Sequence, residues 1–251
     1  MISCDPLPLI TASKELNSEL CLLRKNNEIE KAKELLEKNP ELLITIGWFF
    51  ASDCGRGFLR GAKNYLAIAG KIDDRYIMSA CIQACGNGHM DVAKWLLIIK
   101  PSINISADNE DAFGRACENG NLEVAKWLYL IKPSINISAF KEYAFRSACK
   151  NGYLEVVKWL YSIKPSIDIS SNNEDAFRFA CNYKHLKLAK WLQSLLPDKY
   201  KIIIENNRIV SYNIKQVLPI SNTFVNLSYN SIEELVCPIC YDETKFVEIQ
   251  T

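Results

Sequence analysis

The sequence carries almost no net charge. Its 30 basic and 29 acidic residues leave a formal charge of +1 over 251 residues. The chain therefore lacks the bulk electrostatic field that draws in nucleic acid or an anionic membrane. It also lacks long apolar runs, because the longest one, around residues 42–52, is far too short to span a bilayer. These absences argue against a nucleic-acid-binding or membrane-spanning protein.

Residue patterns that carry catalysis are scarce as well. The two histidines, His89 and His185, do not stand in a pattern with Ser, Cys or a carboxylate that indicates a catalytic triad. No glycine-rich loop follows a predicted strand to hold phosphate. We therefore expect no enzyme activity, no cofactor and no small-molecule ligand.

The N-terminal stretch, MISCDPLPLI, lacks the basic start of a secretory signal peptide. We therefore expect an intracellular protein. In that compartment the ten cysteines of the chain are expected to be reduced thiols.

What the chain does contain is an internal repeat. Tryptophan recurs every 32 residues, at Trp95, Trp127, Trp159 and Trp191. Cysteine keeps the same period, at Cys85, Cys117, Cys149 and Cys181. The clear units are residues 79–110, 111–142, 143–174 and 175–197, and two degenerate copies precede them, at 12–44 and 45–78. A repeat of this length predicts a solenoid, because each unit can bury its apolar face only against its neighbours.

Each unit is predicted to form two short helices. In the unit from Asp111, the first helix has one apolar face, made of Ala112, Phe113, Ala116 and Cys117. A glycine that can adopt positive φ ends this helix. Three of the four clear units have it, at Gly88, Gly120 and Gly152, and the last unit has Asn182-Tyr183-Lys184 in place of the Asn-Gly turn. The second helix ends before Pro133, and its inward side chains are Leu122, Val124, Ala125, Leu128 and Ile131.

The unit pattern D-A-F-x-x-A-C-x-N-G-x-L-E-V-A-K-W-L resembles the ankyrin repeat, T-P-L-H-x-A-A-x-x-G-H-x-x-V-V-x-x-L-L. The period is one residue shorter, Ala-Phe replaces Pro-Leu, and Lys-Pro replaces the closing Gly. The phrase K-W-L-Y-x-I-K-P-S-I-x-I-S is most similar to ankyrin proteins of giant, amoeba-infecting DNA viruses of the mimivirus type. The resemblance covers residues 12–197 and implies an all-α ankyrin-type solenoid of about six helix pairs. It also implies a protein partner and action in the cytoplasm of a host.

Beyond residue 197 the repeat stops. Residues 198–214 alternate apolar and polar side chains around Asn206-Asn207, which predicts a β-hairpin. We expect this hairpin to cover the exposed end of the last repeat. Residues 215–235 have the mixed polar composition of a linker.

The tail, residues 236–251, begins V-C-P-I-C-Y-D and resembles the opening of a RING finger. Structural zinc needs four ligands, whereas the tail offers only Cys237 and Cys240. We interpret it as the remnant of a truncated RING and expect no metal site.

Two features of the repeat allow both a structural and a functional interpretation. The tryptophans could form an aromatic binding surface, but their helical spacing beside inward leucines favours a place in the core. The repeat cysteines could be reactive thiols, but they stand on an apolar face where ankyrin repeats have alanine, which favours small buried residues.

The positions that differ between copies are the candidate recognition surface. Gly114, Arg146 and Arg178 share one slot, and the loop tips also vary while the framework stays constant. In ankyrin-like stacks the loop tips and first helices line the concave face, and aromatic and Arg side chains are favoured anchors. The candidate partner-binding residues are Arg115, Phe140, Lys141, Tyr143, Arg146, Arg178 and Phe179. Drift on a solvated face is the alternative at any one of them.

Three functions fit this sequence. The leading one is a scaffold that binds a protein partner, as a viral protein engaging a host protein. The second is the substrate-recognition part of a RING-type ubiquitin ligase whose RING is incomplete in this chain. The third is a structural spacer, which predicts no saturable partner.

Overall fold

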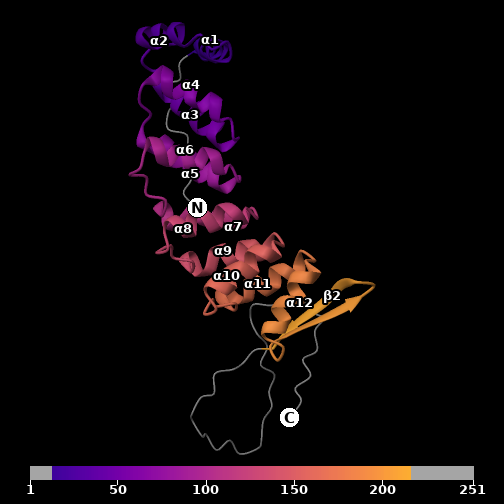
Figure 1. Cartoon of the computed structure of the whole chain (residues 1–251). Helices are drawn as coiled ribbons and strands as arrows, with labels where there is room; N and C mark the ends of the chain where they lie inside the picture. Colours follow the sequence, from indigo (N-terminus) through magenta and orange to yellow (C-terminus); the bar gives the residue numbers. More distant parts are fainter. Residues whose placement is uncertain (1–12, 216–251) are drawn as a thin grey trace, which may run out of the picture. The chain divides into compact units, whose positions relative to one another are not determined.

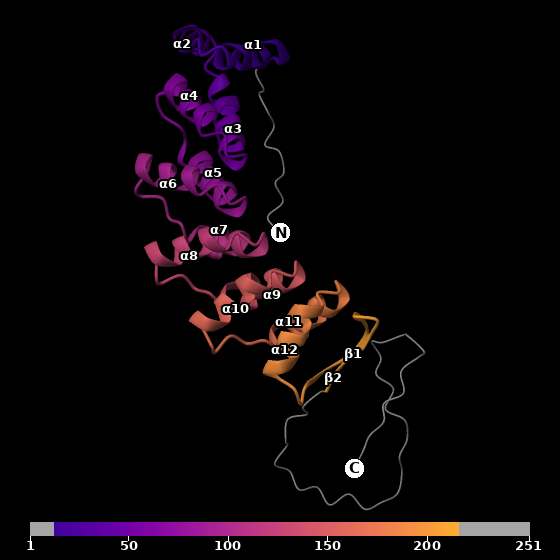
Figure 2. The ribbon, with the colours of Figure 1, turned by 45° about the vertical axis from the view of Figure 1, so that its right-hand side comes forward.

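The computed structural model describes residues 13–215. Within this range twelve helices form six successive pairs (Figure 1). The pairs are α1 (Lys14–Lys25) with α2 (Ile29–Lys38), α3 (Leu42–Gly55) with α4 (Leu59–Ala69), α5 (Asp74–Gly86) with α6 (Met90–Ile99), α7 (Ala107–Glu118) with α8 (Leu122–Ile131), α9 (Ala139–Lys150) with α10 (Leu154–Ile163), and α11 (Ser171–Asn182) with α12 (Leu186–Leu195). From α3 onward, each first helix packs against the first helix of the next pair, and the second helices follow on the other side (Figure 2). This is the all-α helix-pair solenoid that the sequence predicts.

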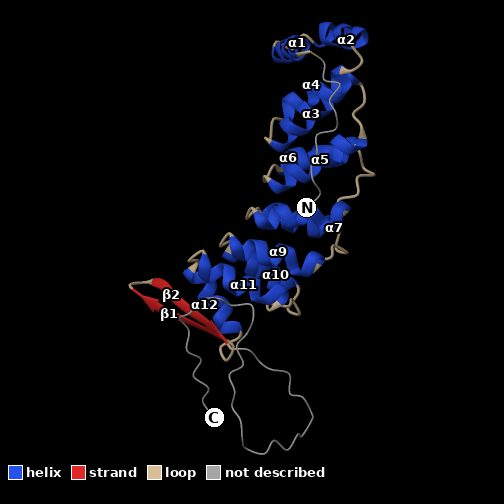
Figure 3. Cartoon of the chain, turned by 180° about the vertical axis from the view of Figure 1, so that it is seen from behind, coloured by secondary structure: helices blue, strands red, loops and turns tan. Residues whose placement is uncertain are grey.

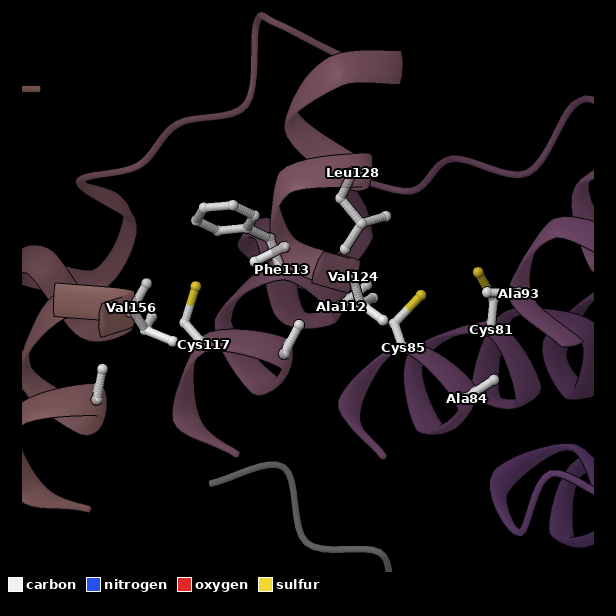
Figure 4. Packing of buried hydrophobic residues seen from close by; sticks show 14 of the residues in the cluster. Cys81, Ala84, Cys85, Ala93, Ala112, Phe113, Cys117, Val124, Leu128 and Val156 are labelled. Atoms are coloured by element: carbon white, nitrogen blue, oxygen red, sulfur yellow. The ribbon is translucent and has the colours of Figure 1, made fainter. Parts of the chain in front are cut away.

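The core is one continuous layer between the helix pairs. Ala112, Phe113, Ala116 and Cys117 are all buried on α7, as the apolar face predicts. Figure 4 shows such side chains from α5, α6, α7, α8 and α10 pointing toward one another. On α8, Val124, Ala125 and Leu128 are buried and Leu122 is half-buried. The expectation for Ile131 was wrong: it is 43% exposed, because α8 ends there and no further turn covers it.

The turn between the two helices of a pair also joins neighbouring pairs. Gly120 has φ +76 there, and Gly88 and Gly152 have similar values. The asparagine just before the glycine donates its side-chain N–H to the preceding pair. Thus Asn119 Nδ2 lies 2.7 Å from the carbonyl oxygen of Gly86, at the end of α5. Asn87 and Asn151 make equivalent bonds, at 2.7 Å each. The Asn-Gly turn therefore ends the first helix of its own pair, and its asparagine caps the end of the first helix in the preceding pair.

The predicted hairpin is present and follows α12 (Figure 3). Strands β1 (Tyr200–Glu205) and β2 (Arg208–Ile214) pair antiparallel. Asn206 and Asn207 have φ of +47 and +60 in the turn between them. Tyr200 is fully buried and its ring stacks on Phe177 of α11, with centroids 4.0 Å apart. The hairpin thus covers the apolar end of the last repeat. The linker and the tail with Cys237 and Cys240 lie outside the described residues.

Candidate protein-binding surface

The seven candidate residues lie on the first helices of three consecutive pairs and on the loop tips before them. Arg115, Phe140, Lys141 and Arg178 are exposed, whereas Tyr143, Arg146 and Phe179 are half-buried. The structure brings four of them together at the start of α9: Phe140, Lys141, Tyr143 and Arg146. Arg115 is held on α7 by Asp111, at 2.9 Å. Phe179 lies apart, beside the Lys150 ammonium, which is 6.0 Å from the ring centroid.

The loop tip at the start of α9 has an unusual backbone. Phe140, Lys141 and Glu142 have φ of +49, +55 and +60, so three successive residues are left-handed. Asn172, Asn173 and Glu174 repeat this geometry at the start of α11. L-residues pay roughly 1–2 kcal/mol each for this conformation, and only Gly, Asn and Asp adopt it routinely. The turn at Phe140 therefore needs support from elsewhere in the fold.

Arg146 supplies that support from one turn further along α9. Its guanidinium donates to the backbone carbonyls of Lys141 and Phe140, at 2.7 and 3.1 Å. It also forms an ion pair of 2.7 Å with Asp175 on α11, and both side chains are less than a fifth exposed. Arg146 thus fixes the loop tip and joins two repeats, and its hydrogen-bonding groups are occupied within the chain.

A glutamate with positive φ at the end of each loop tip, at Glu110, Glu142 and Glu174, is a second support that sequence reasoning missed. Glu142 is buried and accepts a hydrogen bond of 2.6 Å from Ser138 Oγ. Glu110 is buried and accepts one of 3.2 Å from the backbone N–H of Asn136, in the next repeat. Glu174 accepts from Tyr200 and pairs with Lys199, at 2.5 and 2.6 Å. The signal was visible, because the last residue of every tip is Glu while the two before it vary.

Tyr143 is oriented by its own hydrogen bond. Its hydroxyl donates to Glu118 Oε2 at 2.7 Å. Burial, together with this carboxylate, raises the pKa of the Tyr143 phenol, so the hydroxyl stays protonated and the ring keeps its position. The aromatic face of Tyr143 is therefore a fixed surface near the loop tip.

The tryptophans lie at the edge of the core. All four are half-buried and pack against it. Trp159 contacts the preceding repeat, edge to face with Tyr129 at 6.1 Å and tilted against Phe113 at 6.2 Å. Trp191 makes the corresponding edge contact with Tyr161, at 5.6 Å. Trp159 and Trp191 thus each join two successive repeats.

The repeat cysteines are buried free thiols. Burial raises the pKa of the Cys54 and Cys181 thiols to about 12 and displaces those of Cys117 and Cys149 upward as well. The nucleophile is the thiolate, and the raised pKa keeps these thiols protonated. They therefore pack as small apolar groups. On the outer face, Lys126 pairs with Glu123 at 2.9 Å and Lys158 with Glu155 at 3.7 Å.

His185 makes an inter-repeat bond like that of the asparagines. Its Nε2 lies 2.9 Å from the carbonyl oxygen of Lys150. Among residues 13–215, no three His, Cys, Asp or Glu side chains are grouped to hold a metal ion. In the same part of the chain, no helix combines the length and the apolar character needed to cross a membrane.

The comparisons with known proteins bear on these repeats. A model of three ankyrin repeats matches residues 115–202, and a model of many ankyrin repeats matches residues 81–129. Neither match indicates a catalytic family. The comparison with curated proteins found no match.

One similar solved structure is an ankyrin repeat family protein from Legionella pneumophila, with 30% identity and a TM-score of 0.47. The similarity covers 54% of this chain and 41% of that one, so this chain spans less than half of the other's length. Together the two family matches cover residues 81–202, which are thus similar to ankyrin repeats. The helix pairs that contain these residues have the ankyrin-type arrangement that the sequence predicts.

Proposed function

We propose that this chain is a non-enzymatic scaffold that binds a protein partner through its loop tips and the concave face of its first helices. The observation that carries the proposal is Phe140, which is 61% exposed although it is a large apolar residue in a left-handed turn. Backbone outliers of this kind cluster at functional sites. Because Arg146 holds the turn from within, the ring is presented on a fixed backbone, as an interface anchor requires.

The other exposed candidates extend this surface. Lys141 is on the same loop tip, and Arg115 and Arg178 are on the first helices α7 and α11. Charged side chains of this kind are typical of the rim of an interface, around an aromatic anchor. Arg146 lies behind the tip and holds it, while Tyr143 is held by Glu118 and offers an aromatic face near the tip.

The proposal extends to the setting. The phrase K-W-L-Y-x-I-K-P-S-I-x-I-S supports a viral protein that acts in the host cytoplasm on a host protein. Capture of host proteins by the full chain tests this, with Phe140→Asn as the binding variant. Leu130→Asn is the matched control, because Leu130 is 75% exposed but lies on the second helix α8. We expect captured proteins to be lost with Phe140→Asn and kept with Leu130→Asn. Equal retention by both variants contradicts the proposed surface.

The motif V-C-P-I-C-Y-D favours a second candidate, the substrate-recognition part of a RING-type ubiquitin ligase. Elemental analysis of the purified chain separates the two. The scaffold proposal expects no stoichiometric zinc and no ubiquitin transfer by this chain alone. One zinc per chain, lost on Cys237→Ser, would favour the ligase.

A further inference from the structure

A cavity of about 280 Å³ lies between α7 and α9, behind the loop tip that carries Phe140. One wall comes from α7, with Glu110, Asp111, Phe113 and Gly114. The other comes from α9 and the connection before it, with Asn136, Ile137, Ala139, Phe140, Tyr143 and Ala144. The walls are mostly apolar and aromatic. The polar walls are Asp111, Asn136 and Glu110. The Glu110 carboxylate is buried, and its Oε2 has no hydrogen-bond partner among the described residues.

The next repeat shows what this space can hold. Gly114 occupies the slot that Arg146 occupies 32 residues later. By the same period, the walls Ala139, Phe140 and Tyr143 correspond to Ser171, Asn172 and Asp175. There the guanidinium of Arg146 reaches across to Asp175, at 2.7 Å, and Asn172 also bonds to Asp175. An arginine of the chain thus occupies this slot in one repeat, whereas in the other the slot has no side chain, the Tyr143 ring packs close to Gly114, and the cavity lies beside them.

The chemistry of the open cavity also suits an arginine. A guanidinium is planar and stacks on aromatic faces such as Phe140 and Tyr143. It is also the group that best matches a carboxylate in a partly buried place. Among the described residues no cation pairs with Glu110, and Asp111 is paired only with the exposed Arg115. In the next repeat the corresponding Glu142 Oε2 also lacks a hydrogen-bond partner among the described residues, because Arg146 pairs with Asp175 instead. A cationic side chain that enters the cavity from outside is not anchored at the Gly114 slot and can meet the unpaired oxygen of Glu110.

We propose that this cavity receives one arginine side chain of the protein partner, whose guanidinium lies between the aromatic walls and meets the Glu110 carboxylate. The inference rests on the proposed protein-binding function and names the chemistry of the group that is bound. Phe140 then has two roles, since its ring is the exposed anchor and also one wall of the pocket.

The test uses the full chain and a small probe, N-acetyl-arginine methylamide. Its neutral isostere, N-acetyl-citrulline methylamide, is the matched probe. Selective ¹⁵N-glycine labelling gives signals from only ten glycines, and the Gly114 signal is the one that Gly114→Arg removes. We expect the arginine probe to shift the Gly114 signal saturably, while the citrulline probe leaves it in place.

Two matched variants show which carboxylate the arginine probe binds. Glu110→Gln keeps an acceptor for the Asn136 N–H but removes the charge, and we expect it to weaken probe binding about tenfold, which corresponds to the loss of one charge-assisted contact. Glu142→Gln makes the same change in the repeat whose slot Arg146 already fills, and binding should stay within about twofold. Helical circular dichroism shows whether each variant is folded. If Glu110→Gln does not fold, the comparison of the two probes on the unmodified chain decides.

Three results would overturn the proposal: no saturable shift of Gly114, equal shifts with citrulline, or unchanged binding in folded Glu110→Gln. The last would mean that a neighbouring cation of the chain already neutralises Glu110. None of these results touches the scaffold proposal, because the probes contain no partner. Loss or retention of captured proteins on Phe140→Asn tests that proposal separately.

Discussion

Replacing Phe140 by asparagine tests whether the loop tip keeps a phenylalanine in a left-handed conformation that lowers the stability of the fold. The equivalent residue one repeat later is Asn172, which adopts φ +54 in the same left-handed turn. Asparagine tolerates this conformation, whereas phenylalanine does so rarely. The substitution therefore keeps the backbone and removes the ring.

The magnitude follows from two opposing terms. Relief of left-handed strain at one residue gains roughly 1–2 kcal/mol. The ring is 61% exposed, and since full burial of phenylalanine is worth about 1.5–3 kcal/mol, removing the buried part costs about 1 kcal/mol or less. We therefore expect Phe140→Asn to leave the free energy of unfolding unchanged or to raise it by up to about 1 kcal/mol.

Urea unfolding followed by far-UV circular dichroism measures this change. Phe140→Ala is the control, because alanine also removes the ring but does not favour positive φ. We expect Phe140→Asn to be more stable than Phe140→Ala by about 1 kcal/mol, seen as a shift in midpoint at constant slope. The reasoning is refuted if Phe140→Asn loses more than about 1 kcal/mol, since the ring would then be a packing residue.

Three further substitutions or conditions test the supports of the fold. Trp159→Ala should lower the free energy of unfolding in urea by about 2–3 kcal/mol, less than the roughly 3–5 kcal/mol of a fully buried aromatic, because the indole is half-buried. A loss below about 1 kcal/mol would exclude a role of Trp159 in joining repeats. Arg146→Met should lower the free energy of unfolding by about 2–3 kcal/mol, because the Asp175 carboxylate loses its guanidinium partner, and adding Asp175→Asn should recover part of this loss. Equal losses with and without Asp175→Asn would show that the two residues are not coupled. The thiols of Cys54 and Cys181 have a raised pKa of about 12 in the folded state, against about 8.5 in the unfolded chain. Their contribution to stability is fully present below about pH 8.5 and is lost as the pH rises toward 12. The free energy of unfolding should therefore fall with pH above that unfolded value in the parent chain, and fall less steeply in the double variant Cys54→Ala/Cys181→Ala.

The helix pairs and their core could be predicted because both depend on local patterns. The 3.6-residue period places Ala112, Phe113, Ala116 and Cys117 on one face, and the asparagine–glycine turn and the proline set the helix ends. These signals lie within one unit, and the 32-residue period then multiplies them. Ile131 shows the limit of the pattern, because periodicity does not say whether a neighbour covers the last turn.

The left-handed loop tips could not be predicted in the same way. Phe140 and Lys141 have no preference for positive φ, so the conformation comes from contacts made by residues further along the chain. Arg146 holds the carbonyls of the turn, and Glu142 holds its start through Ser138. The sequence showed only that the tip ends in a constant glutamate. Tertiary hydrogen bonds here override local preference.

The slot shared by Gly114, Arg146 and Arg178 shows how one position can change a repeat without disturbing the others. Variation there predicted a recognition surface, but Arg146 turns inward to its own loop tip and to Asp175. With glycine in the slot the Tyr143 ring packs against the backbone, where a Cβ on Gly114 would lie only 3.0 Å from it, and a cavity remains beside the two residues. In a solenoid each repeat contacts only its neighbours, so the change affects one inter-repeat boundary. A recognition pocket can therefore arise by removing a structural arginine from one repeat while the adjacent repeat keeps its own.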